Sequence, residues 1–380
     1  MTESPPDAAG APATLLRRRG TLLSLAARRG DCIEWRVRPD SSGVGLAEGA
    51  AERAIALDWL TPGLQPGETV WLNATAAALQ LGTGGTHFIL ARCRDEADPA
   101  PEFAGREAGH LLKLRYTPLQ HRRMLAEEPA SPHREAVAAC TSLDGTPVLA
   151  VELHSQAAAA IIAARSAAPD LRIVLVWLDS AALPLGLSRL VAGLRAEGAL
   201  DATVTTGQAF GGDLEAVNVY SGLLVARAAA GAELIVAAQG PGIAGTDTTY
   251  GFSGLAVVEA LHAAATLQGT PLFTPRLSSA DPRARHRGLS HHSATILRCL
   301  RTGVDVICPP DTGAWTQAAR AEWPAHTWRE RDPADHSGSL EPYAPLLTTM
   351  GRSLSEDSRF FGTAVAAGVY AAELALRCRI

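Results

Sequence analysis

Short apolar runs separated by turn signals occupy the first third of the chain. Within one of them, CIEWRV (32–37), apolar and polar residues alternate roughly as they do in a half-buried strand. Turn dipeptides such as Pro62-Gly63 and Pro66-Gly67 separate the runs. Strands of this length and spacing predict a small all-β, barrel-like domain over residues 14–94. The expected strands are Thr14–Leu25, Cys32–Arg38, Arg53–Trp59, Thr69–Asn73 and His87–Ala91.

From about residue 147 the pattern changes to apolar runs that alternate with helical periodicity. Four leucine and valine residues between Leu187 and Leu194 recur at i, i+3, i+4 and i+7, which places them on one helix face. This alternation predicts right-handed βαβ units, and so an α/β domain whose mostly parallel sheet has helices on both faces. The expected strands are the runs 147–153, 171–178, 201–206, 233–238, 271–275 and 304–310.

The two patterns divide the chain into the β domain and an α/β domain over residues 109–380. Residues 1–13 are polar, acidic and rich in proline, which is typical of a disordered tail, and they lack the apolar run of a secretory signal. Residues 95–108 are rich in proline and acid and predict a linker. The segment Glu356–Arg377 is expected to form a C-terminal helix. Its small residues, which allow close packing, are Gly362, Ala366 and Gly368.

Composition and charge narrow the class of protein. The net charge of −5 and the pI of 6.1 argue against a protein that binds nucleic acid through bulk positive charge. No apolar run reaches about 18 residues, so we expect no membrane-spanning helix. The six cysteines lack C-x-x-C spacing and are expected to be small buried hydrophobes in a reducing cytoplasm. We therefore expect a cytoplasmic protein with a small-molecule ligand and neither nucleic acid nor membrane as partner, and a homo-oligomer stays open.

Polar or glycine-rich segments follow each of the first five runs of the α/β domain. An open parallel sheet binds ligands in the loops beyond the carboxyl ends of its strands. These segments are therefore expected to line one cleft. They are Glu152–Ser155, Asp179–Ser180, Thr206–Asn218, Gln239–Gly254 and Arg276–His292.

The segment after the fifth run is the richest in candidate chemistry. Histidine titrates near neutrality and ligates metals, while arginine holds carboxylate or phosphate in a planar fork. An alternative is a solvated basic loop followed by a helix that Ser290 caps. Because successive helical residues point about 100° apart, His291 and His292 are not expected to share one metal. The candidates in this segment are Arg283, Arg285, His286, His291 and His292.

The segments after the third and fourth runs have structural alternatives. Asp213 is equally well explained as a helix N-cap after a tight turn at Gly211-Gly212, or as a carboxylate that takes a metal or a proton. The glycines after the fourth run let the backbone approach a ligand, or form a plain flexible connection. Neither nucleotide-binding glycine motif is present. The candidates after the fourth run are Gly240, Gly242, Gly245 and Thr246.

Five segments of the chain resemble a bacterial family, the domain-of-unknown-function 3866 family. They are spread over most of the sequence. The resemblance implies that the two domains belong together as one unit, and it implies no particular activity. The segments are Leu72–Ala76, Leu81–Phe88, Gly109–Gln120, Ala209–Asn218 and Arg285–His292.

The leading hypothesis is a cytoplasmic enzyme that performs acid/base or metal-assisted chemistry, such as hydrolysis, on a small polar or anionic substrate. A divalent metal is the candidate cofactor. The absence of a G-x-S-x-G motif argues against a serine hydrolase. The expected catalytic residues are His154, Asp179, Asp213, Glu215, His286 and His291, and the expected ligand-binding residues are Gly211, Gly212, Gly240, Gly242, Gly245, Thr246, Arg283, Arg285 and His292.

Two other hypotheses use the same residues differently. In one, the loops form a non-catalytic binding module for an anionic metabolite or nucleotide. In the other, the chain is a scaffold subunit whose glycines and histidines are structural. Turnover separates the first alternative from an enzyme, and loops that lie far apart would favour the second.

Overall fold

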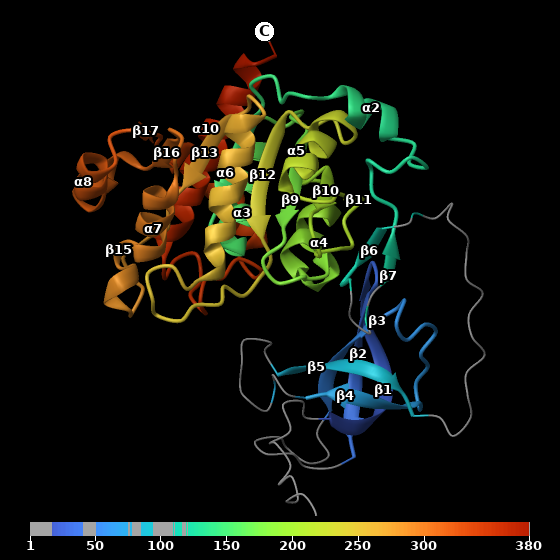
Figure 1. The fold of residues 1–380 in the computed structure, drawn as a ribbon. Coiled ribbons are helices and arrows are strands. Elements are labelled where there is room, and N and C mark those ends of the chain that lie inside the picture. Colours follow the sequence, from blue (N-terminus) through green and yellow to red (C-terminus); the bar gives the residue numbers. More distant parts are fainter. Residues whose placement is uncertain are drawn as a thin grey trace, which may run out of the picture. The chain divides into compact units, whose positions relative to one another are not determined.

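The computed structural model describes residues 17–40, 51–74, 77, 85–93, 109, 111–115, 119 and 121–379 (Figure 1). The chain divides into two compact units, Met1–Phe103 and Ala104–Ile380. The expected tail (1–13) and linker (95–108) lie outside the described residues.

The first unit is a closed five-stranded barrel in the order β1-β2-β3-β5-β4. Neighbouring strands are antiparallel except β3 and β5, which are parallel. β1 is long and irregular enough to pair with both β2 and β4, which closes the barrel. Leucine, valine and tryptophan side chains fill the interior. The expected small β domain is confirmed, with strands β1 (Arg17–Arg29), β2 (Cys32–Pro39), β3 (Glu52–Leu57), β4 (Thr69–Asn73) and β5 (Thr86–Arg92).

The second unit is built on an eight-stranded parallel sheet in the order β11-β10-β9-β12-β8-β13-β16-β17. Six of its strands coincide with the six expected runs. The edge strands β11 (Leu214–Glu215) and β17 (Thr327–Glu330) were not expected, because the first has two residues and the second, TWRE, is largely exposed. The six expected strands are β8 (Pro147–Val151), β9 (Ile173–Leu178), β10 (Ala202–Thr205), β12 (Leu234–Gln239), β13 (Thr270–Thr274) and β16 (Asp305–Cys308).

Helices cover both faces of this sheet (Figure 1), as the sequence predicted. Successive residues of β8 point to opposite faces, with Leu149 in one core and Val148 in the other. On the Leu149 face lie α3 (His154–Ala167), α4 (Arg189–Ala196) and α10 (Ser358–Arg377). On the Val148 face lie α2 (Arg134–Ala139), α5 (Val219–Ala228), α6 (Ala256–Thr266) and α7 (His291–Cys299).

Shorter elements connect these layers. Two small hairpins pair β6 with β7 and β14 with β15. The remaining described elements are β6 (Leu111–Lys113), β7 (His121–Arg123), β14 (Leu277–Ser278), β15 (Gly288–Leu289), α8 (Gly313–Glu322), α9 (Ala334–Ser337) and the 3₁₀ turns η2 (Leu185–Leu187), η3 (Ser253–Leu255), η4 (Ala284–His286), η5 (Pro310–Thr312) and η6 (Gly338–Tyr343).

The strand order creates a switch point at the centre of the sheet. The chain leaves β8 for α3 on one face, whereas it leaves the neighbouring strands β12 and β13 for α6 and α7 on the other face. Connections that diverge in this way leave a crevice at the carboxyl ends of the strands. The topology therefore predicts that a ligand site would lie in the loops after β12, β8 and β13.

Among the described helices, α10 alone is long and apolar enough to cross a membrane by length and composition. Of its most apolar window, 67% is buried inside the protein. Much of that burial is against the alanine-rich helix α3. Gly362 and Gly368 of α10 were both expected to permit close packing, but only Gly368 lies against another helix without room for a side chain. A Cβ atom at Gly368 would overlap the carbonyl oxygen of Ala160 and lie 2.8 Å from its carbon, whereas one at Gly362 would meet Pro333 at an ordinary 3.7 Å.

Replacing these glycines therefore has opposite effects. Gly368→Ala should lower the free energy of unfolding by about 1–3 kcal/mol, because it forces α3 and α10 apart. Gly362→Ala should raise it by up to about 1 kcal/mol, because alanine favours the helix. Urea denaturation monitored by circular dichroism measures both. Equal effects of the two substitutions would contradict the close contact at Gly368.

Candidate functional site

Three histidines from the chain after β13 form a compact cluster. One ring nitrogen of each of His286, His291 and His292 lies within 4.8 Å of those of the other two. The ring centroids are 4.4 Å apart for His291 and His292 and 4.9 Å apart for each of these with His286. The sequence predicted that His291 and His292 would not share one metal, but their ring nitrogens lie close enough for both to face one ion. Their Cβ atoms diverge around the helix axis, but both side chains are long enough to converge again.

Ser290 sets the position of the cluster at the start of α7. Its hydroxyl accepts the backbone N–H of His292 at 3.2 Å, which confirms the expected N-cap. The same hydroxyl lies 2.8 Å from Nδ1 of His286. When Nδ1 of His286 donates this hydrogen bond, its Nε2 lone pair is free. Nε2 of His291 is buried and has no hydrogen-bond partner.

Glu152, which directly follows β8, orients the third histidine. Its carboxylate is fully buried, with one oxygen 3.1 Å from Nδ1 of His292 and the other accepting a 2.9 Å hydrogen bond from Ser293. Phe252, from the loop after β12, stacks on His292 with ring centroids 3.9 Å apart and an interplanar angle of 2°. These contacts fix the ring and leave its Nε2 free. Sequence reasoning placed Glu152 in a candidate loop but gave it no role.

The surroundings favour the uncharged forms of His286 and His291 near neutral pH. Burial, together with the positive charges of Arg276 and Arg283, lowers the pKa of His286 to about 3. Burial, and then the charges of His292 and Arg285, also lower the pKa of His291. A neutral imidazole is the form that binds a metal ion. The site therefore does not have to release protons from these two ligands before a metal binds.

A buried network of ion pairs centres on Asp281, in the same segment of chain as His286. Asp281 is fully buried and pairs with Arg276 at 2.6 Å, with Arg283 at 3.1 Å and with Arg352 at 3.4 Å. Burial alone would raise the pKa of the Asp281 carboxyl, but the hydrogen bonds from Arg283 and the charges of Arg276 and Arg283 hold it well below its usual range. Arg283, expected to bind ligand, is thus engaged with Asp281.

The loop after β12 also contacts this part of the chain. Its Asp247 pairs with Arg285, whose side chain is 42% exposed. Thr246 is bonded within the loop, to Thr248 and to the carbonyl of Gly251. The three candidate glycines of the loop shape its path. Gly240 lies against Trp177, Gly242 adopts a φ of +88°, and Gly245 pairs with Phe252.

His154 and Asp179 have partners outside the cluster. Nε2 of His154 lies 2.8 Å from the hydroxyl of Ser188, and burial lowers the pKa of His154 to about 4. Asp179 accepts backbone N–H groups of Ala182 at 3.0 Å and of Gln208 at 2.7 Å. His154 and Asp179 therefore hold loops at the ends of the strands in place through these hydrogen bonds.

The candidate residues after β10 are tied into the edge of the sheet. Asp213 is not a helix cap, because Asn218 caps α5; its carboxylate instead accepts hydrogen bonds from Thr203. Glu215 accepts the N–H of Gly211 at 2.7 Å and pairs with Lys113 at 3.1 Å. The remaining candidate here, Gly212, has no room for a Cβ beside the backbone of Thr205.

Lys113, the single lysine of the chain, is a buried clamp on this segment. Besides its ion pair with Glu215, its ammonium group donates to the carbonyls of Gly207 at 2.8 Å and Ala209 at 2.9 Å. These partners all lie between β10 and α5, so Lys113 has a structural role and holds this segment in one conformation.

Removing this clamp should destabilise the protein strongly. Lys113→Met should lower the free energy of unfolding by about 3–5 kcal/mol, because it leaves the Glu215 carboxylate buried without its counter-charge. The double variant Lys113→Met/Glu215→Gln should regain part of that loss, since no charge is then buried. Chemical denaturation measures both, and a double variant no more stable than Lys113→Met would contradict the pairing.

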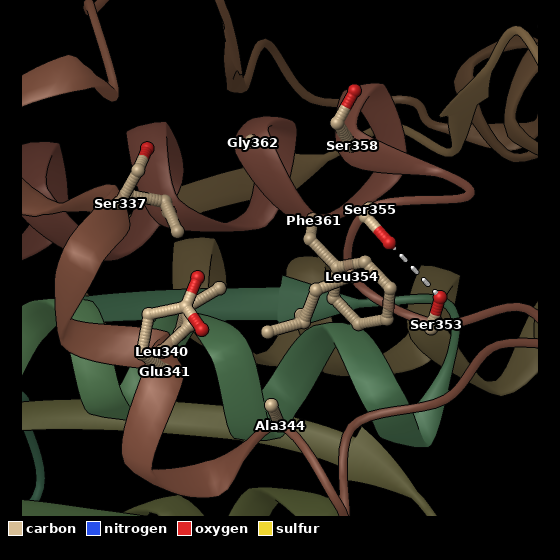
Figure 2. A pocket seen from close by; sticks show the side chains of 11 residues that line it. Ser337, Leu340, Glu341, Ala344, Ser353, Leu354, Ser355, Ser358, Phe361 and Gly362 are labelled. Atoms are coloured by element: carbon tan, nitrogen blue, oxygen red, sulfur yellow. Dashed lines mark hydrogen bonds between the residues drawn. The ribbon is translucent and has the colours of Figure 1, made fainter.

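Two adjoining pockets lie beside the start of α10. One has a volume of about 380 Å³, and among the residues that line it Leu340 and Glu341 lie together on one side, apart from Leu354 and Phe361 (Figure 2). The other, of about 450 Å³, lies beyond the carboxyl ends of β16 and β17. Ser358 lines both pockets. The preceding residue, Asp357, is buried and accepts hydrogen bonds from Ser278 and Arg352. Sequence reasoning assigned no site here.

A family model described as "Protein of unknown function (DUF3866)" matches residues 53–368. This range includes all five segments that carried the resemblance and extends over parts of both units. No curated protein and no solved structure is significantly similar to the chain.

Proposed function

The chain belongs to the DUF3866 family, and from its site we propose that it is a metal-dependent enzyme that hydrolyses a small anionic substrate at the histidine cluster. The observation that carries the proposal is the convergence of three largely enclosed imidazoles, each with a ring nitrogen available to one ion. Two of them have lowered pKa values, which keeps them neutral at pH 7. Imidazole nitrogens that converge in this way are a suitable ligand set for one transition-metal ion.

The cluster fits a catalytic transition-metal site in ligand number and type. Catalytic zinc sites hold the ion through three protein ligands and leave a fourth position for water or substrate. At Zn–N distances of about 2.0–2.1 Å, ligand nitrogens in a tetrahedral site lie about 3.4 Å apart. Separations within 4.8 Å close to this value through small rotations of the imidazole side chains.

Glu152 supplies the support that metal-binding histidines commonly have. A carboxylate that accepts the N–H of a ligating histidine fixes its orientation and makes the other nitrogen a better donor. The buried contact between Glu152 and Nδ1 of His292 has this form. Because both oxygens of Glu152 are already engaged, we assign it a positioning role and not a ligand role.

The chemistry follows from the open position and the charge beside it. A bound divalent metal lowers the pKa of its water to about 7 and so supplies a hydroxide nucleophile near neutral pH. Arg285 is partly exposed, and the side chain of its ion-pair partner, Asp247, is 72% exposed. An anionic group of a substrate can take the place of this weakly held carboxylate on the guanidinium. Arg285 would then hold the substrate next to the cluster.

Metal binding is the first test. Zinc titrated into metal-free protein should bind at one equivalent, and His291→Ala and His292→Ala should each abolish that binding. Glu152→Gln should weaken it about 10- to 100-fold, because the histidine is no longer oriented by a carboxylate. Isothermal titration calorimetry at pH 7.5 measures all four proteins. His336→Ala is the matched control, since His336 pairs with Ser166 outside the cluster and its loss should leave the titration unchanged.

Turnover separates an enzyme from a binding module. The zinc-loaded protein should hydrolyse at least one member of a panel of phosphate and carboxylate esters, and Arg285→Ala should reduce hydrolysis while zinc still binds. Stoichiometric zinc without turnover would favour the non-catalytic module. A titration that is unaffected by His291→Ala and His292→Ala would overturn the metal site itself.

A further inference from the structure

The outer face of the barrel carries arginines beside an exposed tryptophan, independently of the histidine cluster. Register places Trp71 of β4 opposite Arg19 of β1, and Arg36 of β2 opposite Arg53 of β3. Leucine and valine at the alternate positions fill the barrel, so these side chains point outward. We call the outer surface of β4, β1 and β2 the basic face, and it consists of Arg17, Arg19, Arg36, Arg38 and Trp71.

The basic face is accessible. Arg17, Arg19, Arg36 and Arg38 are exposed, and Trp71 is 39% exposed. A tryptophan is a large apolar side chain to leave in water, and the arginines around it prevent the patch from being simply apolar. Neighbouring strands are about 4.8 Å apart, so the basic face extends about 10 Å from β4 over β1 to β2 along the curved surface of the barrel.

Acidic residues neutralise this surface incompletely. Asp40 approaches Arg19 at 3.8 Å, and Glu34 is shared between Arg29 at 2.9 Å and Arg53 at 3.9 Å. The described residues of the barrel contain nine arginines and six aspartates and glutamates. The net charge of −5 for the whole chain therefore conceals a locally positive surface.

We propose that the basic face binds single-stranded nucleic acid, with Trp71 stacking on a base and the arginines contacting phosphates. Proteins that bind single strands combine a positive surface that follows the backbone with aromatic side chains on which bases stack. Five-stranded barrels with crossed strand order serve this purpose in other proteins. A single strand fits better than a duplex, because bases that are paired and stacked have no free face for Trp71.

Binding to an oligonucleotide tests the proposal in the full-length protein. Fluorescein-labelled oligo-dT of about 16 nucleotides should bind at low salt in an anisotropy titration, and log K should fall linearly with log salt concentration. Trp71→Ala should weaken binding about 5- to 150-fold, and Trp71→Phe should retain most of it because the ring is preserved. Arg38→Ala should reduce the slope against log salt by about 0.7 to 1.

Arg28→Ala is the matched control. Arg28 is an exposed arginine of the same strand as Arg19, but it lies at the turn between β1 and β2 and pairs with Asp58 at 3.0 Å. Its loss should leave binding almost unchanged. The proposal would be overturned by no binding of oligo-dT at low salt, by equal losses in Arg28→Ala and Arg38→Ala, or by a duplex that binds as tightly as the single strand and ignores Trp71→Ala.

Discussion

The contact between Glu152 and α7 holds the candidate site together. A carboxylate is fully buried at the end of the central strand β8, and burying an unpartnered charge is costly enough that the fold must supply donors. His292 and Ser293, from the first turn of α7, supply them. This requirement draws the start of α7 onto the end of β8 across 140 residues of chain, and the loop after β12 follows because Phe252 stacks on the same histidine. Segments that follow three adjacent strands, β12, β8 and β13, are thereby brought into contact.

A second, electrostatic constraint acts on the protonation of His286 and His291. Arg276 and Arg283, which pair with the buried carboxylate of Asp281, place positive charge near His286, and burial removes both His286 and His291 from water. Both features disfavour protonated imidazole, which explains the lowered pKa values of His286 and His291. The same environment favours an anion near the exposed Arg285. Burial, together with the arginines of the ion-pair network, thus favours the neutral form of His286, which is the form that binds a metal ion.

Local sequence pattern predicted the elements and their layers well, and it left the order of the strands in the sheet open. Central strands such as β8, β9 and β12 are nearly continuous apolar runs, so the sequence predicted their positions directly. The exposed edge strand β17 has no such run. The order of the strands depends on packing between distant segments. Composition therefore grouped the segment after β10 with the others, although β9 and β12 separate β10 from β8. Asp213 and Glu215 proved to be bonded within that edge. The role of Glu152 could not be predicted, because it is defined by a partner 140 residues away.

The central claim is that one metal ion lies between the three histidines. X-ray diffraction from zinc-loaded crystals, recorded on both sides of the zinc absorption edge, locates the ion without assuming a function. The account predicts one anomalous peak about 2.0–2.1 Å from a ring nitrogen of each of His286, His291 and His292, with Glu152 still bonded to His292. A peak at other residues with the cluster unoccupied, or a zinc ion ligated by Glu152 in place of His292, would contradict it.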